Sequence, residues 1–352
     1  MAKKVFVGMS GGVDSSVTAA LLRDQGYDIT GVYMKNWSKD LPGMICPWKE
    51  DYQDAKRVAV QLGIPFKMYD FQTEYRQRVV DYMLGGYKAG ITPNPDIMCN
   101  QEIKFKLFLD TALSDGADMI ATGHYARSVD GELHTAANVE KDQTYFLYRV
   151  TEDALQHSLM PIGEFETKAE VRSLAKKFSL ATAEKKDSQG ICFVGKVGIK
   201  DFLLHELGQQ PFGVIINQDG VIIGQHDGAI FYTIGQRHGL DVGGGLPYYV
   251  IGKDMAKNEV YVTTDLQDKN LWSKNLQLSN IHWINGIPEP TKTYQVRTRY
   301  RAPLIPCKVS PCKTKKDGEV SILLSEEVRA ITPGQSAVIY DDNRVLGGGV
   351  VI

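Results

Sequence analysis

The sequence has few cysteines and no paired cysteine motif. Five cysteines are spread over 352 residues, and none stands in a C-x-x-C arrangement. An odd and widely spaced set argues against a disulfide scaffold and favours reduced thiols. The interval between Cys307 and Cys312 also differs from the ligand spacing of most zinc sites. We therefore assign no metal to the cysteines and expect some of them to be reactive.

Long apolar runs are also missing. No stretch approaches the roughly 18 apolar residues that a helix needs to span a bilayer, and the first apolar segment is too short for a signal peptide. The hydrophobic share of 43% and the charged share of 23% are typical of soluble globular proteins. We expect a cytoplasmic protein with two or three domains.

The chain carries almost no net charge. The total of −2 gives no sign of a polyanionic partner, but residues 291–316 contain no acidic residue. Basic side chains alternate there with Tyr294 and Tyr300, which fits contact with phosphates and bases. A solvated strand face is the alternative. The basic residues are Lys292, Arg297, Arg299, Arg301, Lys308, Lys313, Lys315 and Lys316.

Strand-like and helix-like segments alternate through about the first 200 residues. Strands are expected at 5–7, 29–34, 66–69 and 119–122, and helices at 52–62, 74–87 and 103–113. This alternation predicts an α/β domain with a parallel sheet. From residue 212 onward, short apolar runs broken by Gly, Asn and Asp predict a small β-rich domain and then a β barrel. The expected domain boundaries are 1–208, 209–274 and 275–352.

Residues 8–16 read Gly-Met-Ser-Gly-Gly-Val-Asp-Ser-Ser and lie between a strand and a helix start. Gly11 and Gly12 lack Cβ atoms and allow the backbone to close around an anion. Three serines and the helix N-terminus add donors, so the loop suits a phosphate or pyrophosphate. It lacks the ending of the Walker loop and the G-x-G-x-x-G spacing. An ordinary glycine turn is the alternative. Asp14 either assists Mg²⁺ or caps the helix.

The loop resembles the S-G-G-x-D-S loop of the ATP pyrophosphatases. Those enzymes cleave ATP between the α and β phosphates and attach AMP to an oxygen of their substrate. The resemblance implies that residues 1–208 form an ATP pyrophosphatase catalytic domain, with the loop at the carboxyl end of its first strand.

Two cysteines stand in distinctive surroundings. Cys99 follows two prolines, which bias Thr92 and Asn94 to extended conformations. A helix starting near Glu102 would place Cys99 just before an N-terminus, where a thiolate is favoured. Cys192 follows Lys185 and Lys186, which likewise favour a thiolate. For Cys46, Cys307 and Cys312 we expect buried packing roles.

Six segments together are similar to bacterial tRNA-specific 2-thiouridylases, in order and over essentially the whole chain. They are Gly8–Ser16, Thr92–Asn100, Ala121–Arg127, Lys141–Leu147, Lys186–Phe193 and Tyr232–Arg237. The resemblance implies that Cys99 is the nucleophile, that Cys192 carries a persulfide, and that Asp96 shuttles a proton or orients the base.

The same resemblance assigns binding residues. Those for ATP are Gly8, Met9, Ser10, Gly11, Gly12, Val13, Asp14, Ser15, Met34 and Gly123. Those for the target base are Asn94, Pro95 and Asp96. Those for tRNA are His124, Asp142, Gln143, Thr144, Arg299, Tyr300 and Gln335.

The implied reaction is 2-thiolation of the wobble uridine of tRNA. AMP is first transferred to the uracil 2-oxygen, and a persulfide then delivers sulfur, which yields 2-thiouridine, AMP and pyrophosphate. The implied requirements are ATP, Mg²⁺, a persulfide and a transient Cys99–Cys192 disulfide. The implied partners are tRNAs for Lys, Glu and Gln and a cysteine desulfurase or sulfur-relay protein. Free sulfide and direct persulfide attack both stay open.

Two other functions compete with this one. An adenylating synthetase of the same nucleotide fold would join ammonia to a carbonyl, but no glutaminase-like domain is visible and ammonia chemistry does not require Cys99 or Cys192. A nucleotide-sensing RNA-binding protein would use the same loop without turnover.

Overall fold

The computed structural model describes the whole chain except residues 1, 42, 44, 187–197, 241, 244, 246 and 312–317 and the side chain of Pro311. The first sheet is parallel and has the strand order β3-β2-β1-β4-β7. Its strands are β1 (Lys4–Gly8), β2 (Asp28–Lys35), β3 (Phe66–Asp70), β4 (Met119–Ala121) and β7 (Ser158–Leu159). The predicted parallel α/β domain is confirmed.

Helices cover both faces of this sheet because its buried side chains alternate. Val5 and Val7 pack in one core cluster, and Phe6 packs in another. The first face carries α1 (Val13–Asp24), α2 (Trp48–Leu62) and α8 (Lys168–Lys177). The second carries α3 (Gln72–Tyr75), a π-helical segment (Arg76–Val80) and α4 (Asp81–Lys88), followed by α5 (Pro95–Met98), a π-helical segment (Cys99–Leu107) and α6 (Phe108–Ser114).

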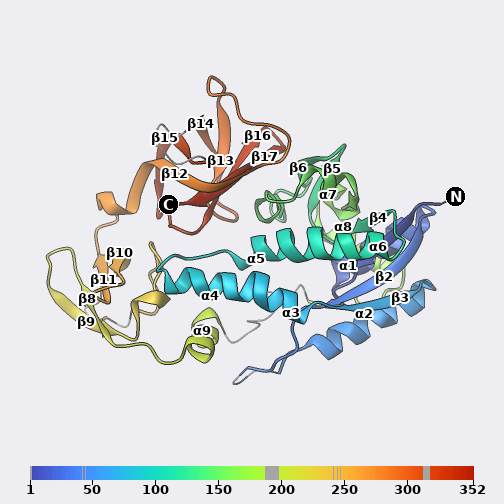
Figure 1. The fold of residues 1–352 in the computed structure, drawn as a ribbon, viewed down its shortest axis with the longest axis horizontal. Coiled ribbons are helices and arrows are strands. Elements are labelled where there is room, and N and C mark those ends of the chain that lie inside the picture. The colour runs from blue at the N-terminus through green and yellow to red at the C-terminus, as the bar shows by residue number, and fades with distance from the viewer. Residues whose placement is uncertain are drawn as a thin grey trace.

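The two helical runs on the second face extend beyond the sheet. In Figure 1, α4 and the α5–α6 run lie side by side and reach from the sheet towards the small domain, beneath the barrel. The run that was expected to begin near Glu102 begins at Pro95 instead. Asn94 caps it, since its side-chain oxygen accepts from the Ile97 N–H at 3.4 Å, and Pro95 stands at the first helical position. Cys99 therefore lies inside a helix, and the prediction that it precedes one is wrong.

The small β domain follows α9 (Ile199–Leu207). Its four-stranded sheet has the order β10-β11-β8-β9, formed by β8 (Gly213–Ile216), β9 (Ile222–His226), β10 (Tyr249–Asp254) and β11 (Glu259–Thr263). Seven of the described residues, including Val250, Val260 and Val262, form a buried core that holds this sheet together. The predicted central β-rich region is confirmed.

The C-terminal barrel closes because β12 pairs with both β15 and β17. Its strands are β12 (Trp272–Trp283), β13 (Tyr294–Arg297), β14 (Ile305–Pro311), β15 (Val320–Arg329), β16 (Ser336–Asp341) and β17 (Arg344–Val351). The hairpin β5 (Ala126–Val129) and β6 (Glu132–Thr135) leaves the first domain and joins β17, with Val345 opposite Leu133. The first domain and the barrel thus share one sheet.

The shorter elements lie in the connections. They are α7 (Glu152–Gln156) and the 3₁₀ turns Thr144–Phe146, Pro161–Glu164, Ala229–Phe231 and Lys269–Leu271. Within the described part of the chain, no helix has the length and apolar character that crossing a membrane requires.

Candidate functional site

The predicted nucleotide residues gather at the carboxyl ends of three adjacent strands, β2, β1 and β4. A Cβ on Gly8, at the end of β1, would lie 3.0 Å from the Cε atom of Met34 on β2. A Cβ on Gly123, just after β4, would lie 2.7 Å from the backbone nitrogen of Ser15. Strand order reverses between β1 and β4, which is where such sheets bind ligands.

The loop backbone adopts a conformation that only glycine tolerates well. Gly11 has φ +77°, and a Cβ there would lie 2.4 Å from the carbonyl oxygen of Asp51 on α2. The Ser10 N–H donates to Ser15 Oγ at 3.2 Å, which holds the loop against the helix start. Gly12 is the N-cap of α1 and supplies no capping side chain. The N–H groups of the first turn are thus available to an anion.

Asp14, in the first turn of α1, forms a charged pair. Its Oδ1 accepts from Lys168 Nζ at 2.6 Å and from the Tyr125 hydroxyl at 3.1 Å. Since Gly12 occupies the N-cap, the alternative that Asp14 caps the helix is wrong. Sequence reasoning missed Lys168, because 154 positions separate it from Asp14 and its own surroundings give no signal. Within the described residues, no group of three or more His, Cys, Asp or Glu side chains could hold a metal ion.

Two of the predicted nucleotide residues have side chains buried in the core. Met9 and Val13 are buried in the core that packs on α1. The Met9 N–H donates to the Val32 carbonyl of the neighbouring strand at 2.8 Å. Their side chains therefore build the support beneath the loop, and the loop surface is left to Ser10, which is exposed.

The segment that carries the predicted base-binding residues is held by all three domains. Gln335 of the barrel donates from Nε2 to the Thr92 carbonyl at 2.8 Å, and the Thr92 N–H donates to the Pro333 carbonyl at 3.1 Å. The hydroxyls of Thr92 and Thr233 lie 3.0 Å apart, which adds a contact to the small domain. Asn94, Pro95 and Asp96 follow directly. The contacts of Gln335 were not foreseen, since only a role in tRNA binding was predicted for it.

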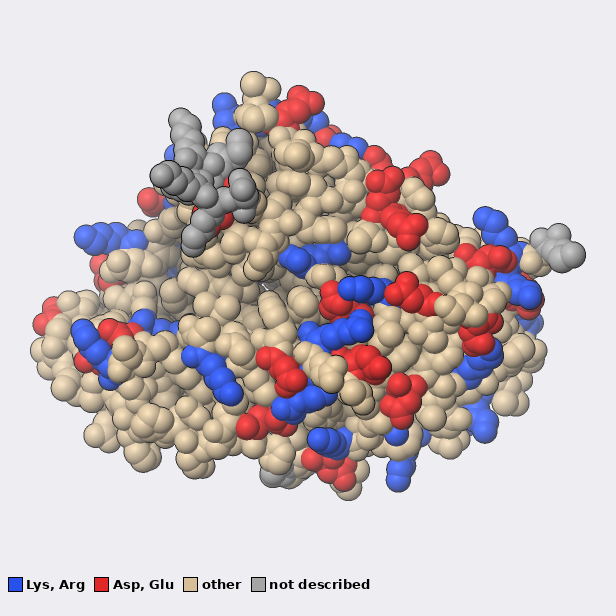
Figure 2. Space-filling view, in the orientation of Figure 1, with Lys and Arg blue, Asp and Glu red and all other residues tan. Residues whose placement is uncertain are grey.

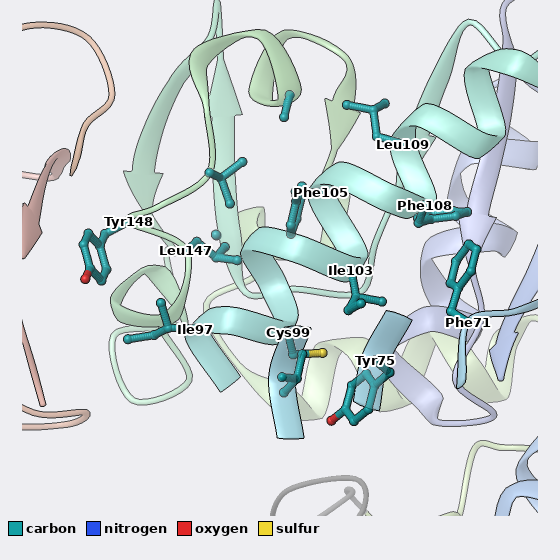
Figure 3. Packing of buried hydrophobic residues seen from close by; sticks show 14 of the residues in the cluster. Phe71, Tyr75, Ile97, Cys99, Ile103, Phe105, Phe108, Leu109, Leu147 and Tyr148 are labelled. Carbon is teal, nitrogen blue, oxygen red and sulfur yellow. The ribbon is translucent and has the colours of Figure 1, made fainter. Parts of the chain in front are cut away.

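Cys99 is 5% exposed and belongs to the core on the second face of the sheet. Figure 3 shows it beside Ile97 and Ile103, with its sulfur directed to the side on which Tyr75 lies. Cys192, the predicted persulfide carrier, lies outside the described residues.

Of the three cysteines predicted to be packing residues, Cys46 and Cys307 are buried. Burial raises the pKa of the Cys46 thiol and raises that of Cys307 to about 12. Both thiols therefore stay protonated and unreactive near neutral pH. Cys312 lies outside the described residues.

Lys104 lies between the turn after β4 and the base segment. It contacts His124 on one side, and its charge acts on Asp96 on the other. Lys104 Nζ lies 3.3 Å from His124 Nε2, and His124 Nδ1 lies 2.8 Å from the Thr122 hydroxyl. Burial lowers the pKa of His124 well below its usual value, and the Lys104 charge adds to this effect. Burial raises the pKa of Asp96, and Lys104 opposes that rise. Sequence reasoning missed Lys104.

Asp142, Gln143 and Thr144 make their contacts inside the protein. Asp142 is 2% exposed and accepts from Arg297 Nη1 at 3.1 Å and from the Thr144 hydroxyl at 2.8 Å. Gln143 Oε1 accepts from the Tyr125 N–H at 2.8 Å. Asp142 and Thr144 join the first domain to Arg297 and Tyr340 of the barrel, whereas Gln143 binds within the first domain. The contact of all three with tRNA stays a prediction.

The basic residues of 291–316, here called the basic run, divide, where the structure describes them, into those paired with a carboxylate and those exposed without such a pair. Arg297 is buried against Asp142, and Lys292 pairs with Asp341 at 2.6 Å. Arg299, Arg301 and Lys308 are exposed. The Tyr300 ring packs 4.5 Å from the Phe146 ring, centroid to centroid. Figure 2 shows acidic and basic side chains mixed over the face in view. The roles of Arg299 and Tyr300 in tRNA binding stay predictions.

Comparison with known proteins assigns the chain to a family. Three family models match in order: the tRNA methyl transferase HUP domain at residues 3–196, the tRNA methyl transferase PRC-barrel domain at 200–264 and the aminomethyltransferase beta-barrel domain at 273–351. The tRNA-specific 2-thiouridylases MnmA of Geobacillus thermodenitrificans and of Bacillus subtilis are each 47% identical to the chain over 354 residues. Each alignment covers 99% of this chain and 94% of the relative. The chain belongs to the bacterial tRNA-specific 2-thiouridylase family.

Membership of this family makes the chain a tRNA-modifying sulfurtransferase. The word "methyl transferase" in the descriptions of two family models differs from the names of these relatives. The relatives decide between the two, since they match nearly the whole chain at 47% identity. The resemblance predicted from six sequence segments is thereby confirmed at the level of the family.

Proposed function

We propose that this 2-thiouridylase uses ATP to transfer AMP to the 2-oxygen of the wobble uridine and then replaces that oxygen with sulfur. One observation carries the proposal. The turn after β4 packs Gly123 against Ser15 of the nucleotide loop, while its next residue, His124, contacts Lys104 on the helix of Cys99. A single turn therefore adjoins both the anion-binding loop and the thiol helix, as a reaction that couples ATP cleavage to thiol chemistry requires.

The nucleotide loop supports cleavage between the α and β phosphates. The glycine-rich backbone and the uncapped start of α1 would hold the pyrophosphate portion of ATP. Mg²⁺ would neutralise the phosphates when it is bound with ATP, and such sites use one or two carboxylates. Asp14 is the acidic residue in the first turn of α1 and fits that need through its second oxygen, since its first accepts from Lys168. Met34 and Gly123 border the nucleotide on either side.

The target base would lie at Asn94, Pro95 and Asp96. Asp96 has a raised pKa because it is buried, and this makes its carboxylate a better proton acceptor than an exposed one. As the uracil 2-oxygen bonds to the α-phosphorus, the N3 proton would pass to Asp96. The 2-oxygen then leaves carbon 2 readily as part of AMP.

Sulfur transfer would use Cys99 and Cys192. In one route the terminal sulfur of a Cys192 persulfide bonds to carbon 2 and AMP leaves, after which the Cys99 thiolate attacks the Cys192 sulfur and releases 2-thiouridine. In the other, Cys99 first frees sulfide, which then attacks carbon 2. Both routes leave a Cys99–Cys192 disulfide, so a thiol reductant must supply two electrons before the next cycle. The raised pKa values of the Cys46 and Cys307 thiols, which keep both protonated, support the choice of Cys99 and Cys192.

The remaining assignments rest on the sequence resemblance. They are cytoplasmic action on tRNAs for Lys, Glu and Gln, and a cysteine desulfurase or sulfur-relay protein as donor. We also propose domains at 1–208, 209–274 and 275–352. The matched family models likewise divide the chain into three parts, with gaps at 197–199 and 265–272.

The direct test is mass spectrometry of nucleosides from unmodified tRNA incubated with ATP, Mg²⁺, a persulfide donor and the protein. We expect 2-thiouridine at the wobble position, with one pyrophosphate released per modified base. Incorporation of nitrogen at carbon 2 would favour the ammonia-using synthetase. Tight tRNA binding with neither product nor pyrophosphate would favour the RNA-binding protein without turnover.

A further inference from the structure

Lys104 lies where the nucleotide loop and the target-base segment meet, and no step above uses it. On one side, its Nζ is 3.3 Å from His124 Nε2, in the turn whose Gly123 packs on Ser15. On the other side, its charge acts on the Asp96 carboxyl. The ammonium therefore lies between the place proposed for the phosphates and the place proposed for the base.

The contacts of His124 fix how Lys104 is held. An ammonium only donates, so Nε2 of His124 must accept and the ring proton must be on Nδ1, which donates to the Thr122 hydroxyl. The ring is 7% exposed, and it packs 5.6 Å from the Phe105 ring, centroid to centroid. Figure 3 shows Phe105 on the same helical run as Cys99. His124 is thus a neutral anchor that orients Lys104 and adds no second positive charge.

Lys104 differs from Lys106 and Lys168 in having no paired carboxylate in the described part of the chain. Lys106 pairs with Glu102 at 3.1 Å, and Lys168 pairs with Asp14 at 2.6 Å. Among the described residues, no carboxylate lies within 4 Å of Lys104 Nζ. A half-buried ammonium whose visible partner is a neutral imidazole keeps its charge available to an incoming anion.

We propose that Lys104 is a catalytic residue of the AMP-transfer step, with its ammonium on the α-phosphate. The bond from the uracil 2-oxygen to phosphorus forms, the bond from phosphorus to pyrophosphate breaks, and the N3 proton passes to Asp96. The fixed positive charge stabilises the phosphoryl oxygens while charge redistributes among them. This inference rests on the proposed function and adds the residue that serves the transferred phosphate.

The test compares Lys104→Met with Lys104→Arg and with Lys106→Met, an exposed lysine two positions along the same helix. Removal of one preorganised charge should lower kcat for tRNA-dependent pyrophosphate release by about 10²- to 10³-fold. The dissociation constants of ATP and tRNA should change little. Lys104→Arg should restore part of the rate, and Lys106→Met should match the wild type. If Lys104→Met fails to fold, Lys104→Gln, which keeps a donor without the charge, replaces it.

The Cys99→Ser background separates this role from one in sulfur transfer. Adding Lys104→Met to Cys99→Ser should still abolish most pyrophosphate release. An unchanged release with lost thiolation in the single Lys104→Met variant would overturn the proposal, because Lys104 would then serve the thiol. A wild-type protein that releases no pyrophosphate with tRNA would instead refute the proposed function.

Discussion

The nucleotide loop and the target-base segment are held in different ways. The loop at residues 8–16 is fixed by its own strand, its own helix and a close approach to α2. The base segment at 92–96 depends on Gln335 and Pro333 of the barrel and on Thr233 of the small domain. The proposed ATP site therefore lies within one domain, whereas the proposed base site is held by all three. Substitutions in the two regions should therefore have different effects.

Gly11→Ala should damage the nucleotide loop most severely. Gly11 has φ +77°, and an added Cβ would lie 2.4 Å from the Asp51 carbonyl, so the loop must shift. A displacement of this kind should lower tRNA-dependent pyrophosphate release by about 100-fold. Gly85→Ala, on α4 of the same domain, is the control, because an added Cβ there would have open space around it. Equal rates in the two variants would show that the loop is not held as described.

Arg297→Met should undock the barrel from the first domain. It leaves the Asp142 carboxylate buried without its cation, which costs about 3–5 kcal/mol of unfolding free energy. Urea unfolding measures the loss, and Asp142→Asn in the same chain should recover much of it. Arg344→Met removes a half-buried pair with Glu132 in the same barrel and should cost about 1 kcal/mol or less. Equal losses at the two sites would contradict a special role for the buried pair.

Gln335→Ala should loosen the base segment and spare the nucleotide loop. Loss of the hydrogen bond to the Thr92 carbonyl costs about 1 kcal/mol, which corresponds to roughly a fivefold fall in kcat for pyrophosphate release. The KM for ATP should stay constant. Gln277→Ala, at an exposed glutamine of the same barrel, should have no effect. A higher Kd for tRNA with an unchanged kcat would mean that Gln335 acts on tRNA instead.

Arg299→Ala should have the smallest effect, because Arg299 is one exposed cation of the barrel. If it contacts a phosphate, the slope of log K for tRNA against log salt should fall by about 0.7 to 0.9. Arg57→Ala, on α2 of the nucleotide domain, is the control at a side chain of 60% exposure. Identical slopes in both variants and the wild type would make the basic run a solvated face.

The sequence predicted the structure of the nucleotide loop better than that of the base segment. The strand, glycine loop and helix at residues 4–24 are contiguous, so their pattern alone predicted the strand–loop–helix arrangement that the structure has. Asn94-Pro95 is itself a helix-start signal, a capping residue followed by a proline, and it places Cys99 inside the helix rather than before it. The partners Lys168 of Asp14 and Gln335 of Thr92 lie 154 and 243 positions away. Contacts between residues so far apart in the sequence depend on the packing of separate elements, which no local sequence pattern encodes.

For the same reason, the sequence did not reveal that the first domain and the barrel share one sheet. The strands β5 and β6 are each four residues long, and β17, which pairs with β6, lies more than 200 positions further along the chain. A break in hydrophobic pattern near residue 275 marks where the barrel begins, but it does not reveal that an earlier hairpin extends it. Domain boundaries drawn along the sequence therefore separate strands that pair in space.

The central claim is that ATP cleavage and thiol chemistry are successive steps of one site. The most direct test measures pyrophosphate and 2-thiouridine together in Cys99→Ser, with Cys307→Ser as the control at a buried thiol. Cys99→Ser should release pyrophosphate only when tRNA is present and should form no 2-thiouridine, whereas Cys307→Ser should do both. Release of orthophosphate, or release of pyrophosphate without tRNA, would contradict the account.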